Sequence, residues 1–240
     1  MGVTLNCDMG ESFGLYRIGD DAGMMPLIVV AYVACGFHAS DPDHMRATVR
    51  LAKANGVKVG AHPSLPDLQG FGRREMKMSR EEIANTVVYQ VGALMGFLRA
   101  EGMELHHIKP HGSLYGMAAR QEDIANGICD AAAVFGVPVF GMTGTLHEKV
   151  YPARGIAFIP EFYADLEYAP GGMLIVTREH DAKDPDLLAE RCVRALTEGQ
   201  GTALDGSYFP VRCETICVHS DTPNAIQIAE AVRSAIAQWH

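Results

Sequence analysis

Histidines, carboxylates and a lysine follow most of the apolar segments of this sequence, at the points where strands should end. Imidazole and carboxylate groups are the usual general acids and bases, and a lysine can stabilise a developing negative charge. Taken singly, such residues often only cap a turn or a helix, and for Asp41 and Asp221 capping is as good an explanation as function. Together they would form a cluster of ionisable groups whose burial costs folding free energy, unless a ligand binds there. The residues are Asp8, Glu11, His38, Asp41, His62, Lys109, His111, Glu161, Asp165, His219 and Asp221.

Short, continuously apolar segments alternate with segments of helical period along the chain. Continuously apolar strands are typical of a parallel sheet that is covered on both faces. A capping box of Ser79 and Glu82 marks one helix start, and Thr222 as N-cap with Pro223 at the first helical position marks the last. We expect helices at 41–56, 79–102, 121–136, 184–199 and 222–239. We expect strands at 3–8, 28–36, 57–63, 105–112, 137–144, 156–165, 173–177 and 215–221.

These repeated strand and helix units predict an α/β fold. Right-handed crossovers between parallel strands give one sheet, and the lack of a linker or break favours closure into an irregular (β/α) barrel of about seven parallel strands. We expect one domain over residues 1–240. In such barrels the carboxyl ends of the strands share one rim, where barrel enzymes keep their active sites. The strand-end residues should therefore meet there.

The composition excludes several classes of protein. Hydrophobic residues make up 48% and charged residues 20% of the chain, as in an ordinary globular protein. The net charge of -9 argues against a nucleic-acid partner. The six cysteines form no C-x-x-C pair, so we expect free thiols in a reducing compartment. No apolar run is long enough for a membrane span, and we expect a cytoplasmic protein without membrane contact.

The segment 63–78 has no regular period and reads as a long binding loop or lid. Arg73 and Arg74 follow a G-F-G turn in it, and a guanidinium there could hold a substrate carboxylate through two hydrogen bonds. Neighbouring arginines rarely point the same way, so we expect only one of the two to face the site.

Other catalytic patterns fit less well. Asp8, His38 and His62 are candidate ligands for a divalent metal, but no H-E-x-x-H motif is present and their spacing does not identify a metal site. The chain also has no G-x-S-x-G nucleophile motif and no glycine-rich nucleotide-binding loop of the usual kinds.

Six motifs resemble the LamB/YcsF family, which is named for lactam utilisation and described as the A component of bacterial 5-oxoprolinase. They occur in the family's order and extend from residue 5 to residue 223. The resemblance implies a (β/α) barrel related to the glycoside hydrolase/deacetylase barrels. It also implies action with partner subunits B and C, which together open 5-oxoproline to glutamate with hydrolysis of ATP. The motifs are LNCDMGESFG, ACGFHASDP, GAHPSLPDLQGFGRR, KPHGSLY, PEFYADLEY and VHSDTP.

The resemblance leads to a hypothesis about roles in opening a small cyclic amide, 5-oxoproline or a related lactam. Lys109, His62 or His111 would stabilise charge on the ring carbonyl oxygen, and Asp8 or Glu11 would orient or deprotonate the attacking water. Arg73 or Arg74 would hold the substrate carboxylate. The other expected substrate-binding residues are His38, Glu161, Asp165, His219 and Asp221.

The chain departs from the family pattern at five positions, and some alternatives stay open. Tyr32 and Gly116 replace asparagines, Ser40 and Ser220 replace glycines, and Leu166 replaces an arginine. Such changes in a polar pocket can change which substrate is accepted. A metal-dependent deacetylase or amidohydrolase acting alone, and a non-catalytic binding or regulatory protein of the complex, are the rival interpretations. The sequence also leaves open whether the chain forms a homo-oligomer.

Overall fold

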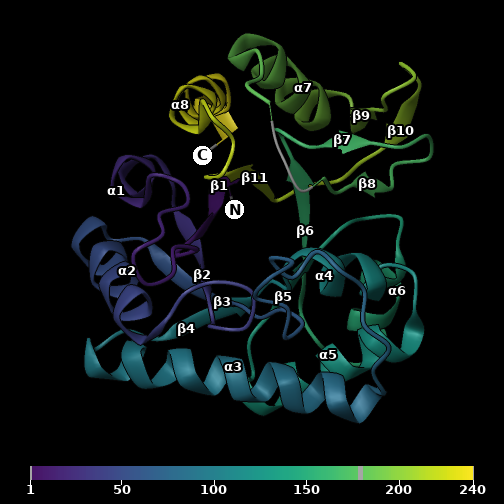
Figure 1. Ribbon diagram of the computed structural model, residues 1–240. Helices are drawn as coiled ribbons and strands as arrows, with labels where there is room; N and C mark the ends of the chain where they lie inside the picture. Colours follow the sequence, from purple (N-terminus) through teal and green to yellow (C-terminus); the bar gives the residue numbers. More distant parts are fainter. Residues whose placement is uncertain (1, 178–180, 240) are drawn as a thin grey trace.

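A closed barrel of seven parallel strands forms the centre of the computed structural model, which describes residues 2–177 and 181–239 (Figure 1). The strand order around the barrel is β1-β11-β6-β5-β4-β3-β2, so the first and last strands are neighbours and close it. This confirms the irregular (β/α) barrel predicted from the sequence. The barrel strands are β1 (Thr4–Met9), β2 (Val30–Ala34), β3 (Lys58–His62), β4 (Leu105–Ile108), β5 (Val139–Gly141), β6 (Phe158–Tyr163) and β11 (Thr215–His219).

Helices connect the strands and cover the outside of the barrel. The capping box of Ser79 and Glu82 starts the longest helix, as predicted. Asp41 caps the helix that follows β2, because its carboxylate accepts the backbone N–H groups of Asp43 and His44. The helices are α1 (Asp21–Met24), α2 (Pro42–Asn55), α3 (Arg80–Ala100), α4 (Gly112–Ala118), α5 (Glu122–Phe135), α6 (Leu146–Ala153), α7 (Pro185–Thr197) and α8 (Ala225–Ala235), with short 3-10 helices η1 (Met25–Leu27) and η2 (Ala237–Trp239).

The last helix begins later than predicted. We expected Thr222 as its N-cap and Pro223 as its first residue, but α8 begins at Ala225, after Asn224. The Thr222 hydroxyl instead donates to Asp165 Oδ2 at 3.3 Å. Because the Thr222 side chain is bound to Asp165 at the rim of the barrel, it does not cap the helix. The predicted start of the last helix was therefore wrong.

The segment 173–177 was predicted as a barrel strand and is not one. Only Leu174–Ile175 is extended, as β8, and it pairs antiparallel with β7 (Glu167–Tyr168). Gly171 and Gly172 lie between β7 and β8, and each has a φ of 87°. Glycine adopts this backbone conformation readily, and here it turns the chain into a hairpin. The segment therefore folds back on β7 instead of joining the barrel.

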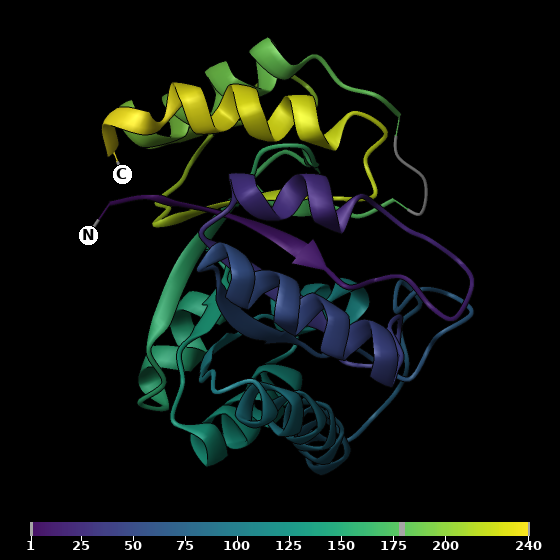
Figure 2. The ribbon, with the colours of Figure 1, turned by 90° about the vertical axis from the view of Figure 1, so that its left-hand side faces the viewer.

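Two pairs of helices pack together on opposite sides of the barrel. Helices α3 and α5 lie along one side and α7 and α8 along the other (Figures 1 and 2). A second two-stranded ribbon, β9 (Gln200–Thr202) and β10 (Tyr208–Pro210), lies beside α7. The chain ends meet, since Val3 N–H donates to Trp239 O at 2.7 Å.

The structure also describes the apolar character of the helices and the state of the cysteines. Among residues 2–177 and 181–239, no helix has the length and apolar character needed to cross a bilayer. All six cysteines carry free thiols, and five of them are buried.

Candidate active site

Asp8 lies at the centre of a charged group at the carboxyl ends of the barrel strands. The sheet register places it beside His219 of β11 and Tyr32 of β2. Its Oδ1 accepts a hydrogen bond from Lys109 Nζ at 2.9 Å, and its Oδ2 lies 3.1 Å from His62 Nε2. All of these side chains are buried. The structure thus brings together residues that are far apart in the sequence.

Asp8 and Lys109 stabilise each other's charged forms. Burial alone would raise the pKa of Asp8, but its partners His62 and Lys109 hold that pKa well below the usual value. Burial alone would lower the pKa of Lys109, but Asp8 raises the pKa of this ammonium above its usual value. The pair is therefore ionised at neutral pH. A fixed ammonium in a water-poor site interacts strongly with negative charge that develops nearby.

Three tyrosine rings surround the Lys109 ammonium. Its Nζ lies 4.8 Å from the ring centre of Tyr32, 5.2 Å from that of Tyr163 and 5.8 Å from that of Tyr115. Each distance is within the range at which a cation is attracted to the face of an aromatic ring. The rings hold the ammonium in place while they keep bulk water away.

His219 is oriented by Asp165. The His219 Nδ1 lies 2.8 Å from Asp165 Oδ1, and the backbone N–H of His219 donates to Asp165 Oδ2 at 2.7 Å. Burial opposes a charge on His219, but Asp165 raises the pKa of this imidazole above its usual value. The other ring nitrogen, Nε2, lies 3.6 Å from Asp8 Oδ2. Asp8, Cys217 and His219 each present a ligand atom within 4.8 Å of the others.

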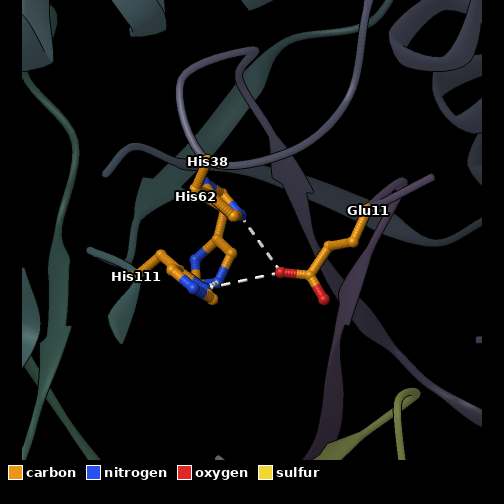
Figure 3. Close-up of side chains that lie close together, drawn as sticks. All are labelled: Glu11, His38, His62 and His111. Atoms are coloured by element: carbon orange, nitrogen blue, oxygen red, sulfur yellow. Dashed lines mark hydrogen bonds and ion pairs between the residues drawn. The ribbon is translucent and has the colours of Figure 1, made fainter. Parts of the chain in front are cut away.

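Glu11, His38, His62 and His111 form a second group, called here the histidine cluster (Figure 3). Glu11 Oε1 lies 3.1 Å from His38 Nε2 and 3.4 Å from His111 Nδ1. His38 and His111 stack with ring centres 3.8 Å apart, and His62 lies edge-on to both. Their ligand atoms lie within 4.8 Å of one another, so the cluster could hold a metal ion. It contains His38 and His62 of the candidates named from the sequence, and Asp8 contacts it through His62.

Burial governs the charge of the histidine cluster. It lowers the pKa values of His38, His62 and His111 below that of a free imidazole. It also raises the pKa of Glu11 well above the usual value, and the negative charge of Asp8 adds to this rise. The three rings are therefore neutral at pH 7.

The loop between β3 and α3 folds over the cluster. Phe71 has a φ of 53°, and its carbonyl accepts a hydrogen bond from His111 Nε2 at 2.8 Å. The next residue, Gly72, must lack a side chain, since a Cβ there would lie 2.2 Å from Ser64 Oγ. The Gly72 carbonyl also accepts the backbone N–H of Ser113. The segment predicted as a lid is thus anchored to the rim by its own backbone.

The two arginines of this loop point in different directions. The Arg73 side chain is 7% exposed, and its Nη2 lies 3.0 Å from Asp221 Oδ2. Arg74 pairs with Asp67 at the surface, and its side chain is 47% exposed. The structure brings Arg73 to the rim and leaves Arg74 outside it, as expected for neighbouring arginines. Asp221 contacts Arg73 and does not cap α8.

Two neighbouring cavities lie at the rim and share part of their lining. The inner one, of about 30 Å³, is lined by Asp8, Lys109 and His219 together with apolar groups that include Leu166. A cavity of this volume holds about two water molecules. The outer one, of about 260 Å³, shares Arg73 and other residues with the inner one and is large enough for a small organic ligand.

Glu161 lies deeper in the barrel than the other predicted residues. Its Oε1 accepts the Tyr32 hydroxyl at 2.5 Å. In the described part of the chain, Glu161 Oε2 is buried without a hydrogen-bond partner. Glu161 therefore lies beneath the site, in buried contact with Tyr32, one of the residues that differ from the family pattern.

The other departures lie around the same site. Leu166 lines the inner cavity and Gly116 the outer one. The Ser220 hydroxyl donates to the Asp8 carbonyl at 3.1 Å. Ser40 has a φ of 73°, a conformation that favours the glycine of the family pattern. The cavity wall near Leu166 is thus apolar where the family has a positive charge.

Sequence reasoning missed the aromatic residues of the site. Tyr115 and Tyr163 contact Lys109, and Phe71 packs edge-on against His38 and His111. The signal was present, since Tyr115 and Tyr163 stand in motifs that supply ionisable residues. Both tyrosines are also buried in the core of the protein.

The fold and the site define a (β/α)-barrel protein that gathers buried ionisable side chains at one rim. The chain belongs to the LamB/YcsF family, whose model matches residues 3–240.

Known relatives match almost the whole chain. The lactam utilization protein lamB of Emericella nidulans is 44% identical over 242 residues, which cover 99% of this chain and 95% of that protein. The A component of the 5-oxoprolinase of Thermus thermophilus is 45% identical, with 99% and 97% covered. The crystal structure of a lactam utilization protein from Thermus thermophilus superposes with a TM-score of 0.90 at 43% identity, covering 99% of this chain and 97% of that one.

Proposed function

We propose that this chain takes part in the ring-opening hydrolysis of a small cyclic amide, 5-oxoproline or a related lactam. It would act as the A component of a complex with B and C partners that consumes ATP. Its relatives are named as a lactam utilization protein and as the A component of 5-oxoprolinase, and these names support the substrate class. The observation that carries the proposal is the buried Lys109 ammonium beside a cavity that also contains Asp8 and Arg73.

The proposed roles follow from the geometry. Lys109 would stabilise the negative charge that develops on the ring carbonyl oxygen, because its ammonium is fixed by Asp8 and by aromatic rings. Arg73 would hold the substrate carboxylate with its planar guanidinium. Asp8 or Glu11 would accept a proton from the attacking water, and His219 is the second basic group near that water.

ATP would supply the driving force that hydrolysis of an unstrained amide lacks. In the proposed reaction the lactam oxygen attacks the γ-phosphorus, and ADP leaves. One water then adds to the activated ring carbon and the ring C–N bond breaks, with the proton going to the nitrogen, which leaves an acyl phosphate. A second water hydrolyses the acyl phosphate to the carboxylate and inorganic phosphate. The partner subunits would supply the nucleotide site, which accords with the lack of a glycine-rich phosphate loop in this sequence.

The test is to mix the purified chain with candidate B and C subunits and ATP, and to screen 5-oxoproline and related lactams for ring opening. We expect turnover that requires this chain and ATP together. Turnover by the lone chain without ATP would contradict the proposal.

The histidine cluster favours one alternative, a metal-dependent amidohydrolase or deacetylase that needs no partner. Loss of a lone-chain activity on treatment with a chelator would support that alternative.

We also propose a cytoplasmic location, which the free thiols support.

A further inference from the structure

In two imidazoles of the histidine cluster, a hydrogen bond to a backbone carbonyl fixes which ring nitrogen is protonated. His62 Nδ1 lies 2.7 Å from the carbonyl oxygen of Lys109, and His111 Nε2 lies 2.8 Å from that of Phe71. A carbonyl oxygen can only accept a hydrogen bond, so each of these outer nitrogens must carry the proton. A neutral imidazole carries a single N–H, so a ring that donates from its outer nitrogen presents a lone pair at its inner nitrogen, which is Nε2 in His62 and Nδ1 in His111.

The two inner nitrogens face each other, with His62 Nε2 and His111 Nδ1 2.9 Å apart. Asp8 Oδ2 lies 3.1 Å from the first nitrogen, and Glu11 Oε1 lies 3.4 Å from the second. Four atoms that can bind a cation therefore converge on one small volume.

The Glu11 carboxyl is buried at a position where a bound cation would stabilise its ionised form. It contacts His38 and His111 and is 3% exposed. The ammonium of Lys109 is bound to Asp8. A buried carboxylate among neutral rings is costly unless a cation compensates it.

We propose that a divalent first-row transition-metal ion binds in the histidine cluster, with His62 Nε2, His111 Nδ1 and Glu11 Oε1 as its ligands. Two nitrogens and one carboxylate oxygen suit zinc, iron or manganese, whereas magnesium and calcium prefer oxygen ligands. Two ligands about 2.0–2.1 Å from one ion at a tetrahedral angle lie roughly 3.3 Å apart. The observed separations of 2.9 and 3.4 Å match this spacing.

The surroundings of these ligands are also those of a metal site. Metal-binding histidines usually donate their other N–H to a carbonyl or a carboxylate, as His62 and His111 do. His38 is not a ligand, because its ring is parallel to that of His111 within 8° and the ion cannot lie in both ring planes. Its Nε2 instead contacts Glu11 and fixes the orientation of that carboxylate.

No step of the proposed reaction is assigned to the ion, so its binding can be tested without an activity assay. The full-length chain is stripped with a chelator, dialysed, and titrated with Zn²⁺ by calorimetry. Co²⁺ is added separately, and its visible absorption is recorded. We expect one bound ion per chain and a cobalt spectrum typical of mixed nitrogen and oxygen ligands.

The two histidine variants each remove one inner ligand atom and keep the outer hydrogen bond. His62→Asn retains an N–H for the Lys109 carbonyl, and His111→Gln retains one for the Phe71 carbonyl. Glu11→Gln removes only the charge. We expect each to weaken Zn²⁺ binding by more than about 100-fold, since the loss of supporting residues alone costs 10–100-fold. The control is His147→Asn, a buried histidine whose nitrogens contact Met142 N–H and the Tyr115 carbonyl, and it should bind as the wild type does.

Two results would overturn the proposal. One is the absence of stoichiometric Zn²⁺ binding by the wild type, which would mean that a shared proton separates His62 and His111. The other is unchanged binding in the folded variants, which would place the ion elsewhere. Circular dichroism identifies any variant that fails to fold, and the remaining variants still decide the outcome.

Discussion

Lys109 and Asp8 form a buried ion pair at the rim of the barrel, with Nζ 2.9 Å from Oδ1 and both side chains 3% exposed. The pair joins β1 to the end of β4 across the barrel opening. It also leaves Asp8 Oδ2 directed at His62. The stability of the rim and the proposed chemistry therefore depend on the same contact.

Lys109→Met should destabilise the protein by about 3–5 kcal/mol, because it leaves Asp8 buried without its ammonium partner. The double variant Asp8→Asn with Lys109→Met should recover part of that loss, since no uncompensated charge remains. Urea unfolding of the wild type, both single variants and the double variant measures this coupling. Losses that simply add would show that the two residues do not act as a pair.

Arg73→Ala and Arg74→Ala should differ sharply, although the residues are adjacent. Arg73→Ala is expected to raise KM for the lactam by roughly 30-fold or more, because losing one partner of a buried charge pair costs about 2–5 kcal/mol. Arg74→Ala removes a contact with Asp67 that lies away from the rim and should leave KM unchanged. Steady-state kinetics of the reconstituted complex make the comparison. Equal effects would contradict the assignment of Arg73 to the substrate carboxylate.

Tyr32→Phe should destabilise the protein by about 1–3 kcal/mol, because Glu161 would lose the hydrogen bond that its Oε1 accepts. Tyr89→Phe is the matched control, since the Tyr89 side chain is largely exposed and its hydroxyl can bond to water. Chemical unfolding at neutral pH measures both. A Tyr32 variant as stable as the control would show that this contact contributes nothing.

His147 should make the protein less stable in mild acid. Burial lowers the pKa of His147 to about 3, whereas in the unfolded chain it is about 6.5. The unfolded state therefore binds a proton first as the pH falls below 6.5, and stability is lost from there down to the folded pKa. Between pH 7 and pH 5 this one group costs about 2 kcal/mol.

The variant His147→Asn isolates that effect. It should be less stable at pH 7 because the hydrogen bond to the Tyr115 carbonyl is lost, but its stability should fall less between pH 7 and pH 5. Urea unfolding at several pH values compares the two proteins. Parallel pH profiles would show that His147 is protonated in the folded state.

Much of the fold could be predicted because the signals were local. The apolar strands, the capping box at Ser79 and the cap at Asp41 are readable within a few residues of sequence. The errors came from long-range contacts. Thr222 has the residue type of a helix cap, but its hydroxyl donates to Asp165, which lies between β6 and β7. The glycine turn at 171–172 folds the 173–177 segment onto β7.

The sequence predicted which residues form the candidate site better than it predicted the contacts between them. Barrel topology brings strand-end residues to one rim, so Asp8, His62 and Lys109 could be grouped without a structure. The sequence could not show that two carbonyls direct the imidazole lone pairs of His62 and His111 inward. It also could not tell Arg73 from Arg74, since only the backbone of the folded loop sets their directions.

The most direct test of the account measures glutamate formation and ATP hydrolysis by the complex reconstituted with 5-oxoproline, comparing the wild-type chain with Lys109→Met and Arg74→Ala. Removing a single donor that stabilises a developing oxyanion typically lowers kcat by about 10²–10³-fold. We predict a loss of that size for Lys109→Met at a temperature where the variant is folded, and no loss for Arg74→Ala. Wild-type turnover with Lys109→Met, or turnover in the absence of this chain, would contradict the account.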